Sequence, residues 1–378
     1  METLQELRKE LDIIDEQITE LYEKRMEICG QVADYKIKNG RKVFDKTREN
    51  EKLAAVAAKA SSEFNRKGIC ELFEQLMSMS RKLQYQRLTE EGALGRLPFI
   101  ALDRLDTDGA RIVFQGVEGA YSQAAMEKYF GKDINSFHVP AFRDAMEAIE
   151  EGTADYAVLP IENSSAGAVD QVYDLLVEFE NYIVGETVLP IEHMLVGIPG
   201  AKLSEIERVY SHPQGLMQCA RFLDKHGDWQ QISVANTAAA AKKVLEDQNP
   251  AEAAVCSETA AKLYGLEILE RKINFENDNS TRFIVVTNQK VFLKNASKIS
   301  ICFEAAHARE SGSLYHLLSH FIYNDLNMSK IESRPVEGRS FEYRFFVDFD
   351  GNLADAAVKN AIRGLREEAL NLRILGNY

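Results

Sequence analysis

Apolar side chains recur every three or four residues through the first part of the chain. This row consists of Leu4, Leu7, Leu11, Ile14, Ile18, Leu21, Ile28, Val32 and Tyr35, with the charged Arg25 at one position of the same spacing. The spacing predicts one long helix with a single apolar seam, which Asn39-Gly40 ends. Asp45 is a good N-cap for a second helix, and a third is predicted over about residues 67–88. Three helices this long and thin bury little among themselves, so we expect a second subunit to complete their packing.

The pattern changes after residues 89–110, a stretch with several glycines that is typical of a linker. Over residues 111–290, short β-rich runs alternate with capping residues and helix-like stretches. The runs are residues 111–115, 156–160, 208–211, 232–235, 253–256 and 282–287. This alternation predicts an α/β domain with a mostly parallel sheet, and its length predicts two lobes with a cleft between them.

A third pattern covers residues 298–378. It predicts strand 299–304, helix 313–324, strands 328–336 and 341–350, helix 353–365 and strand 369–375. The order βαββαβ is that of a ferredoxin-like unit, which usually pairs with a copy of itself. We therefore expect a helical segment over residues 1–88, the linker, the α/β domain and this terminal unit.

Charge and composition exclude several classes of function. The formal net charge of the 378 residues is −14, which argues against nucleic acid or an anionic membrane surface as a partner, because both need concentrated Lys and Arg. Neither a signal peptide nor an apolar run of about 18 residues is present. Five scattered cysteines without Cys-x-x-Cys spacing indicate reduced thiols and a cytoplasmic protein. Only His316 and His320 have ligand-like spacing, and nothing completes a set around them, so we expect no metal.

Cationic residues on the first helix form a candidate anion site. Arg25 and Lys36 lie 11 residues apart, which puts them on nearly the same helix face at about 16 Å. The alternative for Arg25 alone is a residue at the edge of the core whose stem packs and whose charge reaches water. Arg8 lies about 25 Å from Arg25 along the same helix, so it can share a small ligand only with the Arg25 of a partner subunit.

This segment resembles the all-helical chorismate mutase family over about residues 4–88. The resemblance is carried by Leu7-Arg8, Asp15, Lys24-Arg25, Lys36, Asp45-x-x-Arg48-Glu49 and Ser80-x-x-x-Gln84. A Claisen rearrangement needs neither nucleophile nor cofactor, only a folded dicarboxylate with charge stabilised on the breaking ether oxygen. The resemblance implies that Arg25 and the partner's Arg8 hold carboxylates and that Lys36 and Gln84 face the ether oxygen. It places Asp45 and Glu49 near the hydroxyl, with Arg48 and Ser80 completing the wall.

Four polar loops follow predicted strands of the α/β domain. They are Gly116-x-x-Gly119-Ala120-Tyr121-Ser122, Glu162-Asn163-Ser164-Ser165, Ser211-His212-Pro213-Gln214 and Asn279-Ser280-Thr281-Arg282-Phe283. Each loop taken alone is explained by helix capping and turn chemistry. No Gly-x-Gly-x-x-Gly or P-loop sequence is present, so a nucleotide is not expected.

Together these loops resemble prephenate dehydratase across about residues 111–288, and the Thr281-Arg282-Phe283 triplet is the most diagnostic mark. The resemblance implies a two-lobed fold similar to type II periplasmic binding proteins, with substrate in the cleft. It assigns Thr281 as the catalytic hydroxyl that donates to the leaving oxygen. Asn163, Ser211, Gln214 and Arg282 are implied substrate contacts, whereas His212 is equally consistent with a structural role.

Residues 298–376 resemble the ACT-type regulatory domain of prephenate dehydratases. Two motifs carry this resemblance: Gly312-Ser313-Leu314 before a predicted helix and Glu332-Ser333-Arg334-Pro335 at the end of a strand. In the family these motifs line a phenylalanine site at a subunit interface. Here Ser311 and Ser313 replace the Pro and Ala that the family usually has.

The three resemblances imply a multidomain homodimer or larger homo-oligomer: all-α helices, a two-lobed α/β domain and a ferredoxin-like unit. The implied activity converts chorismate to prephenate and then to phenylpyruvate without a cofactor, under feedback by phenylalanine. One alternative is an arogenate dehydratase in the second domain. The other is a ligand-binding regulatory protein without turnover.

Overall fold

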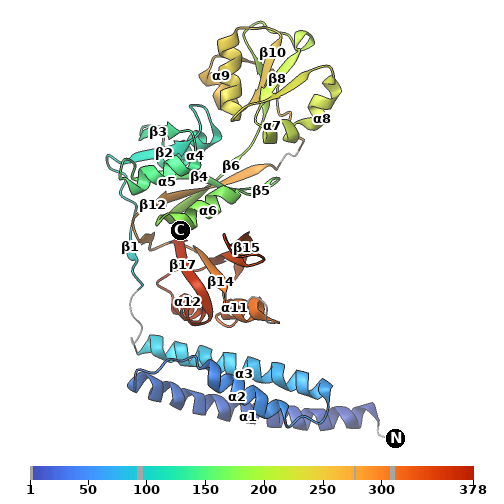
Figure 1. Cartoon of the computed structure of the whole chain (residues 1–378), viewed down its shortest axis with the longest axis vertical. Helices are drawn as coiled ribbons and strands as arrows, with labels where there is room; N and C mark the ends of the chain where they lie inside the picture. The colour runs from blue at the N-terminus through green and yellow to red at the C-terminus, as the bar shows by residue number, and fades with distance from the viewer. Residues whose placement is uncertain (1–2, 92–96, 276–277, 307–310) are drawn as a thin grey trace. The chain divides into compact units, whose positions relative to one another are not determined.

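The computed structural model describes residues 3–91, 97–275, 278–306 and 311–378, and it divides into two compact units. Unit 1 combines residues 1–98 with 301–373, and unit 2 combines residues 99–300 with 374–378. Figure 1 shows the helices of the N-terminal segment and the labelled elements of both units. Within the described part of the chain, no helix meets the length and apolar content that a membrane span requires.

The N-terminal segment folds as three helices: α1 (Leu4–Lys38), α2 (Lys46–Ala57) and α3 (Glu63–Glu90). Thr3 and Glu6 form a capping box that starts α1. The Asp45 side chain accepts from the backbone N–H of Arg48 at 3.0 Å and caps α2, as its sequence position predicts. The third helix begins four residues before the predicted start.

The apolar seam of α1 stays largely open to solvent within the single chain. Its exposed members are Leu4, Leu7, Leu11, Ile14, Ile18, Leu21, Ile28 and Val32, each at least 40% exposed. Side chains of this type are normally buried, so this row is an unusually long apolar surface on one helix.

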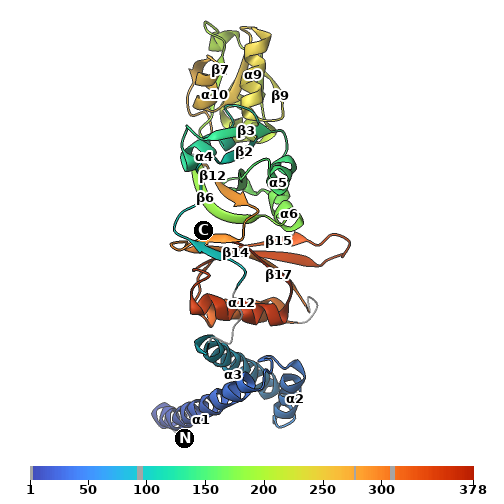
Figure 2. The same cartoon turned by 90° about the vertical axis from the view of Figure 1, so that its left-hand side faces the viewer.

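The C-terminal segment has the predicted order βαββαβ. Its elements are β14 (Lys298–Ala305), α11 (Ser313–Ile322), β15 (Met328–Pro335), β16 (Tyr343–Asp350), α12 (Ala356–Glu368) and β17 (Ala369–Asn377). The strand order is β15-β16-β14-β17, with β15 antiparallel to β16. In Figure 2, α12 runs along one face of this sheet. Phe303, Phe321 and Phe349 are fully buried and form part of the core.

The first lobe of unit 2 is a sheet of order β6-β12-β4-β2-β3. Its strands are β2 (Arg111–Gln115), β3 (Asn135–Val139), β4 (Tyr156–Asn163), β6 (Tyr182–Pro190) and β12 (Ser280–Thr287), with α4 (Tyr121–Phe130), α5 (Phe142–Glu150) and α6 (Asp170–Glu178). The short strand β5 (Gly167–Ala168) pairs with β4, and β1 (Ile100–Leu102) pairs with β13 (Val291–Leu293).

The second lobe is a sheet of order β11-β7-β10-β8-β9. Its strands are β7 (Met194–Gly197), β8 (Arg208–Ser211), β9 (Gln230–Ser233), β10 (Glu252–Cys256) and β11 (Glu267–Glu270), with α7 (Pro213–Gln218), α8 (Ala220–Leu223), α9 (Thr237–Asp247) and α10 (Glu258–Leu263). Figure 1 shows this lobe around β8 and β10.

The two lobes confirm the α/β class, but the expectation of a mostly parallel sheet was wrong. Strands β2, β3 and β4 are parallel, as are β8, β9 and β10. In contrast, β12 is antiparallel to both β4 and β6, and β7 is antiparallel to both β10 and β11. The chain leaves the first lobe through β6 and returns through β12, and these crossings produce the antiparallel pairs.

The two crossings run beside each other and are hydrogen-bonded. Ile191 N–H donates to the Asn279 carbonyl at 2.8 Å, and Ile273 N–H donates to the His193 carbonyl at 3.0 Å. His193 N–H also donates to Asn274 Oδ1 at 3.1 Å. The junction of the lobes therefore consists of two chain segments that are hydrogen-bonded to each other. Asn279 lies in the second of them, immediately before β12.

Replacing Leu159 by Ala should destabilise unit 2 by about 2–5 kcal/mol, because Leu159 is fully buried in the central strand β4. Urea-induced unfolding followed by circular dichroism measures the loss. Leu263→Ala removes the same atoms from an exposed site and should cost less than about 0.5 kcal/mol. Equal losses in the two variants would contradict this account of the core.

Candidate active sites

In unit 2 the polar residues at the lobe junction gather around Thr281. Antiparallel pairing of β12 with β4 sets Thr281 opposite Asn163. Asn163 Nδ2 lies 2.9 Å from Thr281 Oγ1 and 2.8 Å from Asn279 Oδ1. Thr281 is 8% exposed. Two of the loops singled out in the sequence therefore meet at one buried point.

The direction of these hydrogen bonds is fixed by the backbone. Asn163 Oδ1 accepts the N–H groups of Ser165 and Ala166 at 3.0 and 2.9 Å. Because backbone N–H groups only donate, the oxygen of the Asn163 amide must face them and its nitrogen must face Thr281. Thr281 therefore accepts from Asn163, and its own hydroxyl proton is free to point toward a substrate.

A chain of polar contacts continues from Asn163 into the second lobe. The Ser165 hydroxyl donates to Asn163 Oδ1 at 2.8 Å and accepts from Gln218 Nε2 at 3.0 Å. Gln218 Oε1 lies 3.0 Å from His193 Nε2, and His193 Nδ1 lies 3.2 Å from the Tyr121 hydroxyl. The contact between Ser165 and Gln218 joins the two lobes directly.

The buried groups at the end of this chain are uncharged near neutral pH. Burial lowers the pKa of His193, whereas the hydrogen bond that His193 Nε2 donates to Gln218 Oε1 works to raise it. Burial raises the pKa of Tyr121 well above its ordinary value and raises the pKa of Cys219 and of Cys256 to about 12 each. The hydrogen bonds in this series of side chains are therefore formed between uncharged groups.

Three further predicted contacts do not join this cluster. Ser211 is fully buried in the second lobe, and its hydroxyl donates to the Val255 carbonyl at 2.8 Å. Arg282 forms ion pairs with Glu162 at 3.3 Å and Glu186 at 3.2 Å. Alternation along the strand turns Arg282 to the face opposite Thr281.

Gln214 is half-buried near the start of α7, where the His212 ring accepts the Gln214 N–H and caps the helix. The residue that reaches the cluster is Gln218, one helical turn later. Sequence reasoning missed Gln218, His193 and Asn279. The turn spacing after Gln214 is the one signal in the sequence that points to Gln218.

In unit 1 the helices bring several predicted mutase residues together. Arg25 Nη1 donates to Ser80 Oγ at 2.5 Å and to the Leu76 carbonyl at 2.9 Å. Lys36 Nζ donates to the Val43 carbonyl at 2.6 Å. Burial lowers the pKa of Lys36, while Asp45, Glu367 and Glu49 work to raise it.

The remaining predicted positions differ in their surroundings. Gln84 is buried on α3, and its Oε1 has no hydrogen-bond partner among the described residues. Arg48 is exposed and lies 3.5 Å from Glu51. Arg8 is exposed on the first half of α1.

Arg81 is a buried cation that sequence reasoning missed. Its guanidinium lies 2.6 Å from the Glu49 carboxylate and 3.2 Å from Glu368 at the end of α12. Glu368 also lies 3.1 Å from His320 Nε2. Burial works to raise the pKa of Glu368, but His320 and Arg81 outweigh it and lower the pKa.

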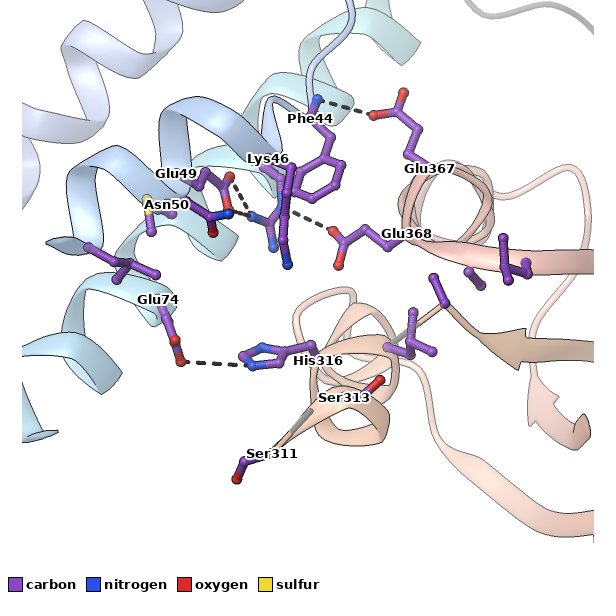
Figure 3. A pocket seen from close by; sticks show the side chains of 17 residues that line it. Phe44, Lys46, Glu49, Asn50, Glu74, Ser311, Ser313, His316, Glu367 and Glu368 are labelled. Carbon is purple, nitrogen blue, oxygen red and sulfur yellow. Dashed lines mark hydrogen bonds and ion pairs between the residues drawn. The ribbon is translucent and has the colours of Figure 1, made fainter. Parts of the chain in front are cut away.

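This charge cluster lines a pocket of about 390 Å³ in unit 1. Figure 3 shows Glu49 and Glu368 pointing toward each other across it, with Ser313 and His316 below. Glu367 receives hydrogen bonds from the backbone N–H of Phe44 at 3.1 Å and from the Tyr85 hydroxyl at 2.6 Å. Two adjacent acidic side chains of α12 therefore contact the helical segment.

The two predicted effector motifs lie on different elements of the C-terminal segment. Gly312 precedes α11 with φ at +79°, a conformation that favours glycine. Ser313 and Leu314 begin α11 and are half-buried. The motif Glu332-Ser333-Arg334 lies on β15, at the end of the strand order of this sheet.

A bundle of helices is followed by a two-lobed α/β unit with a threonine at the lobe junction, and the comparisons with known proteins identify a fused mutase and lyase. A chorismate mutase type II family model matches residues 7–85, and a prephenate dehydratase family model matches residues 112–291. The bifunctional chorismate mutase/prephenate dehydratase of Escherichia coli strain K12 is 32% identical over 376 residues, covering 98% of this chain and 95% of the relative. The chain belongs to the bifunctional chorismate mutase/prephenate dehydratase family.

Two further similarities each cover less of the chain. Arogenate dehydratase/prephenate dehydratase 6 of Arabidopsis thaliana is 37% identical and covers 71% of this chain and 68% of the relative. The crystal structure of prephenate dehydratase from Arthrobacter aurescens in complex with L-Phe matches with a TM-score of 0.66 and 32% identity. It covers 71% of this chain and 89% of that one. The protein is thus an enzyme with mutase and dehydratase domains, not a binding protein without turnover.

Replacing Arg81 by Met should destabilise unit 1 by about 3–5 kcal/mol, because Glu49 and Glu368 lose their buried cation. Denaturant unfolding measures the loss. Arg87→Met breaks an exposed pair with Asp34 and should cost less than about 1 kcal/mol.

The decrease in the free energy of unfolding caused by Arg81→Met should also depend on pH. The pKa of Glu368 is lower in the folded protein than its ordinary value of 4.5, so the ionised carboxylate stabilises the fold at pH values above 4.5. This stabilisation is lost as the pH falls through the folded-state pKa. The difference between wild type and Arg81→Met should therefore narrow below pH 4.5. A difference that stays constant with pH would contradict the assignment to Glu368.

Proposed function

We propose that the helical segment rearranges chorismate to prephenate through a site built around Arg25 and Lys36. Arg25, with Ser80 at 2.5 Å, binds one carboxylate, and Lys36 and Gln84 donate to the ether oxygen. The carrying observation is that buried Gln84 and the cation Lys36 sit on facing helices α3 and α1. Because the negative charge develops on the ether oxygen, donors aimed there lower the barrier.

The other predicted mutase residues complete this site. Asp45 and Glu49 lie near Lys36, since both act on its pKa, and we assign them to the substrate hydroxyl. Arg48 closes the wall. Arg81 holds the Glu49 carboxylate in place and is proposed as its positioning residue.

A second subunit is required by this proposal. The exposed apolar seam of α1 is the surface that it covers, and an antiparallel α1 would bring the partner's Arg8 to the second carboxylate. We therefore infer a homodimer or larger homo-oligomer.

We propose that unit 2 converts prephenate to phenylpyruvate with Thr281 as the catalytic hydroxyl. The single observation that supports this is the fixed amide of Asn163, which donates to Thr281 Oγ1 at 2.9 Å and leaves the Thr281 proton for the leaving oxygen. Loss of carboxylate and hydroxide makes the ring aromatic, so the site needs to stabilise a leaving group rather than supply a cofactor. Ser211, Gln214 and Arg282 stay in the proposal as residues around the cleft.

Arogenate is the second candidate substrate of unit 2. The observation behind it is the 37% identity, over 71% of this chain, to an Arabidopsis thaliana relative named arogenate dehydratase/prephenate dehydratase. The five free cysteines support a cytoplasmic enzyme in either case.

We propose that the C-terminal segment is an ACT-type regulatory domain that binds phenylalanine. Its βαββαβ order and the motifs at Gly312–Leu314 and Glu332–Arg334 support this, and the related Arthrobacter aurescens structure contains L-Phe. Phenylalanine would inhibit by favouring the conformation that binds it better.

Lys36→Ala should abolish mutase turnover and leave dehydratase turnover of added prephenate unchanged, because the two residues lie in different units. Thr281→Ala should do the reverse. Assays of chorismate loss and of phenylpyruvate formation on the same samples provide the check, and each variant is the control for the other. Normal mutase turnover in Lys36→Ala would refute the mutase assignment.

Purified protein given chorismate should form phenylpyruvate without any added cofactor, and added phenylalanine should reduce the rate. Prephenate and phenylpyruvate are followed separately by chromatography. Accumulation of prephenate alone, with conversion of added arogenate to phenylalanine, would select the second candidate. A rate indifferent to phenylalanine would contradict the proposed regulatory domain.

A further inference from the structure

The side-chain oxygen of Asn279 accepts a hydrogen bond, whereas its side-chain nitrogen has no partner among the described residues. Its Oδ1 accepts from Asn163 Nδ2 at 2.8 Å and lies 3.4 Å from the Ser165 hydroxyl oxygen. The residue is 3% exposed, and its Nδ2 has no hydrogen-bond partner anywhere in the described parts of the chain. A buried donor without a partner destabilises a folded protein, so native structures rarely keep one without a function.

The unpaired atom is identified by the surrounding hydrogen bonds. The backbone N–H groups of Ser165 and Ala166 fix the oxygen of the Asn163 amide. Asn163 Nδ2 is therefore the group that faces Asn279, and a donor requires the oxygen of Asn279 opposite it. The nitrogen of Asn279 is left as the unpaired half.

The unpaired nitrogen belongs to the same cluster as the Thr281 hydroxyl. One nitrogen, Asn163 Nδ2, lies 2.8 Å from Asn279 Oδ1 and 2.9 Å from Thr281 Oγ1. Thr281 accepts this hydrogen bond, and no hydrogen bond donated by its hydroxyl is found among the described residues. Two donors without acceptors are thus held together at the lobe junction.

We propose that Asn279 is a further catalytic residue, whose Nδ2–H donates, together with the Thr281 hydroxyl, to the oxygen that leaves the substrate ring. This inference rests on the proposed role of Thr281. In the reaction the C–C bond to the carboxylate breaks and its electron pair becomes a ring double bond, with carbon dioxide released. The C–O bond breaks with its pair on oxygen, and the resulting hydroxide takes a proton from solvent to form water. Two neutral donors stabilise the charge that develops on that oxygen.

The hydrogen-bonded side chains that lead from His193 to Asn163 explain why the side-chain nitrogen of Asn279 stays without a partner. Gln218 bridges the lobes by donating to Ser165, and Ser165 donates to Asn163. Each of these contacts holds the Asn163 amide in the orientation that leaves Asn279 Nδ2 without a partner. Rigid neighbours of this kind are what keep an unfavourable arrangement at a functional site.

Asn279→Asp is the sharpest test, because it keeps the oxygen that accepts from Asn163 and removes the N–H donor. Asn279→Ala removes the donor without adding a charge, so a loss shared by both variants reports the donor itself. We expect kcat of the dehydratase to fall about 100-fold in both variants while KM changes less than about threefold. Asn135→Asp, at an exposed position at the start of β3 in the same lobe, is the matched control and should leave both constants unchanged.

Prephenate is the substrate used, and Thr281→Ala is measured beside the variants. An inactive Thr281→Ala with a normal kcat in both Asn279 variants would overturn this inference and leave the proposed function standing. A rise confined to KM would overturn the leaving-group role. An active Thr281→Ala would refute the proposed function itself. Circular dichroism melting and mutase turnover of each sample show that the variant is folded, and Asn279→Ala provides the reading if the Asp variant does not fold.

Discussion

The return of the chain from the second lobe into the middle of the first is the constraint on which the dehydratase site depends. Strand β12 lies between β4 and β6 and pairs with both. That register sets Thr281 beside Asn163, although 118 residues separate them in the chain. A shift of one residue would turn Thr281 to the opposite face of the sheet and bring Arg282 to its place. The site therefore requires β12 to be paired in this register.

The proposed mutase site differs from the dehydratase site because two of its main residues lie on a single helix. Arg25 and Lys36 lie on one helix, and their partners come from α3 and from the residues just before α2. In our proposal a single chain does not complete it, because the thin bundle leaves the α1 seam exposed and Arg8 lies on the first half of α1. Arg81 adds a further dependence, since it joins Glu49 of the helical segment to Glu368 of α12. Within unit 1, Arg81 thus connects Glu49 to the C-terminal segment through ion pairs.

Sequence reasoning succeeded where a feature depends on neighbouring residues in the chain. The heptad-like row of α1, the Asp45 cap and the βαββαβ order are set by local spacing. It failed where the feature depends on pairing across the chain. The antiparallel entry of β12 leaves no local trace, because a buried strand has the same composition in either direction. Gln218 was missed for a related reason: which turn of α7 faces Asn163 depends on how the lobes meet.

Arg81 is a second case in which sequence reasoning failed, because its ion-pair partners come from distant parts of the sequence. A lone arginine on an otherwise apolar helix face is usually a residue whose stem packs and whose charge reaches water. Here two carboxylates from distant segments surround it, and burial makes each of the three charges depend on the others. In unit 2 the buried cluster instead uses neutral amides and hydroxyls, and the backbone N–H groups of Ser165 and Ala166 orient the amide of Asn163. A site that must receive a dianion and release carbon dioxide and hydroxide benefits from donors without net charge, because they stabilise the leaving oxygen without holding the product carboxylate tightly.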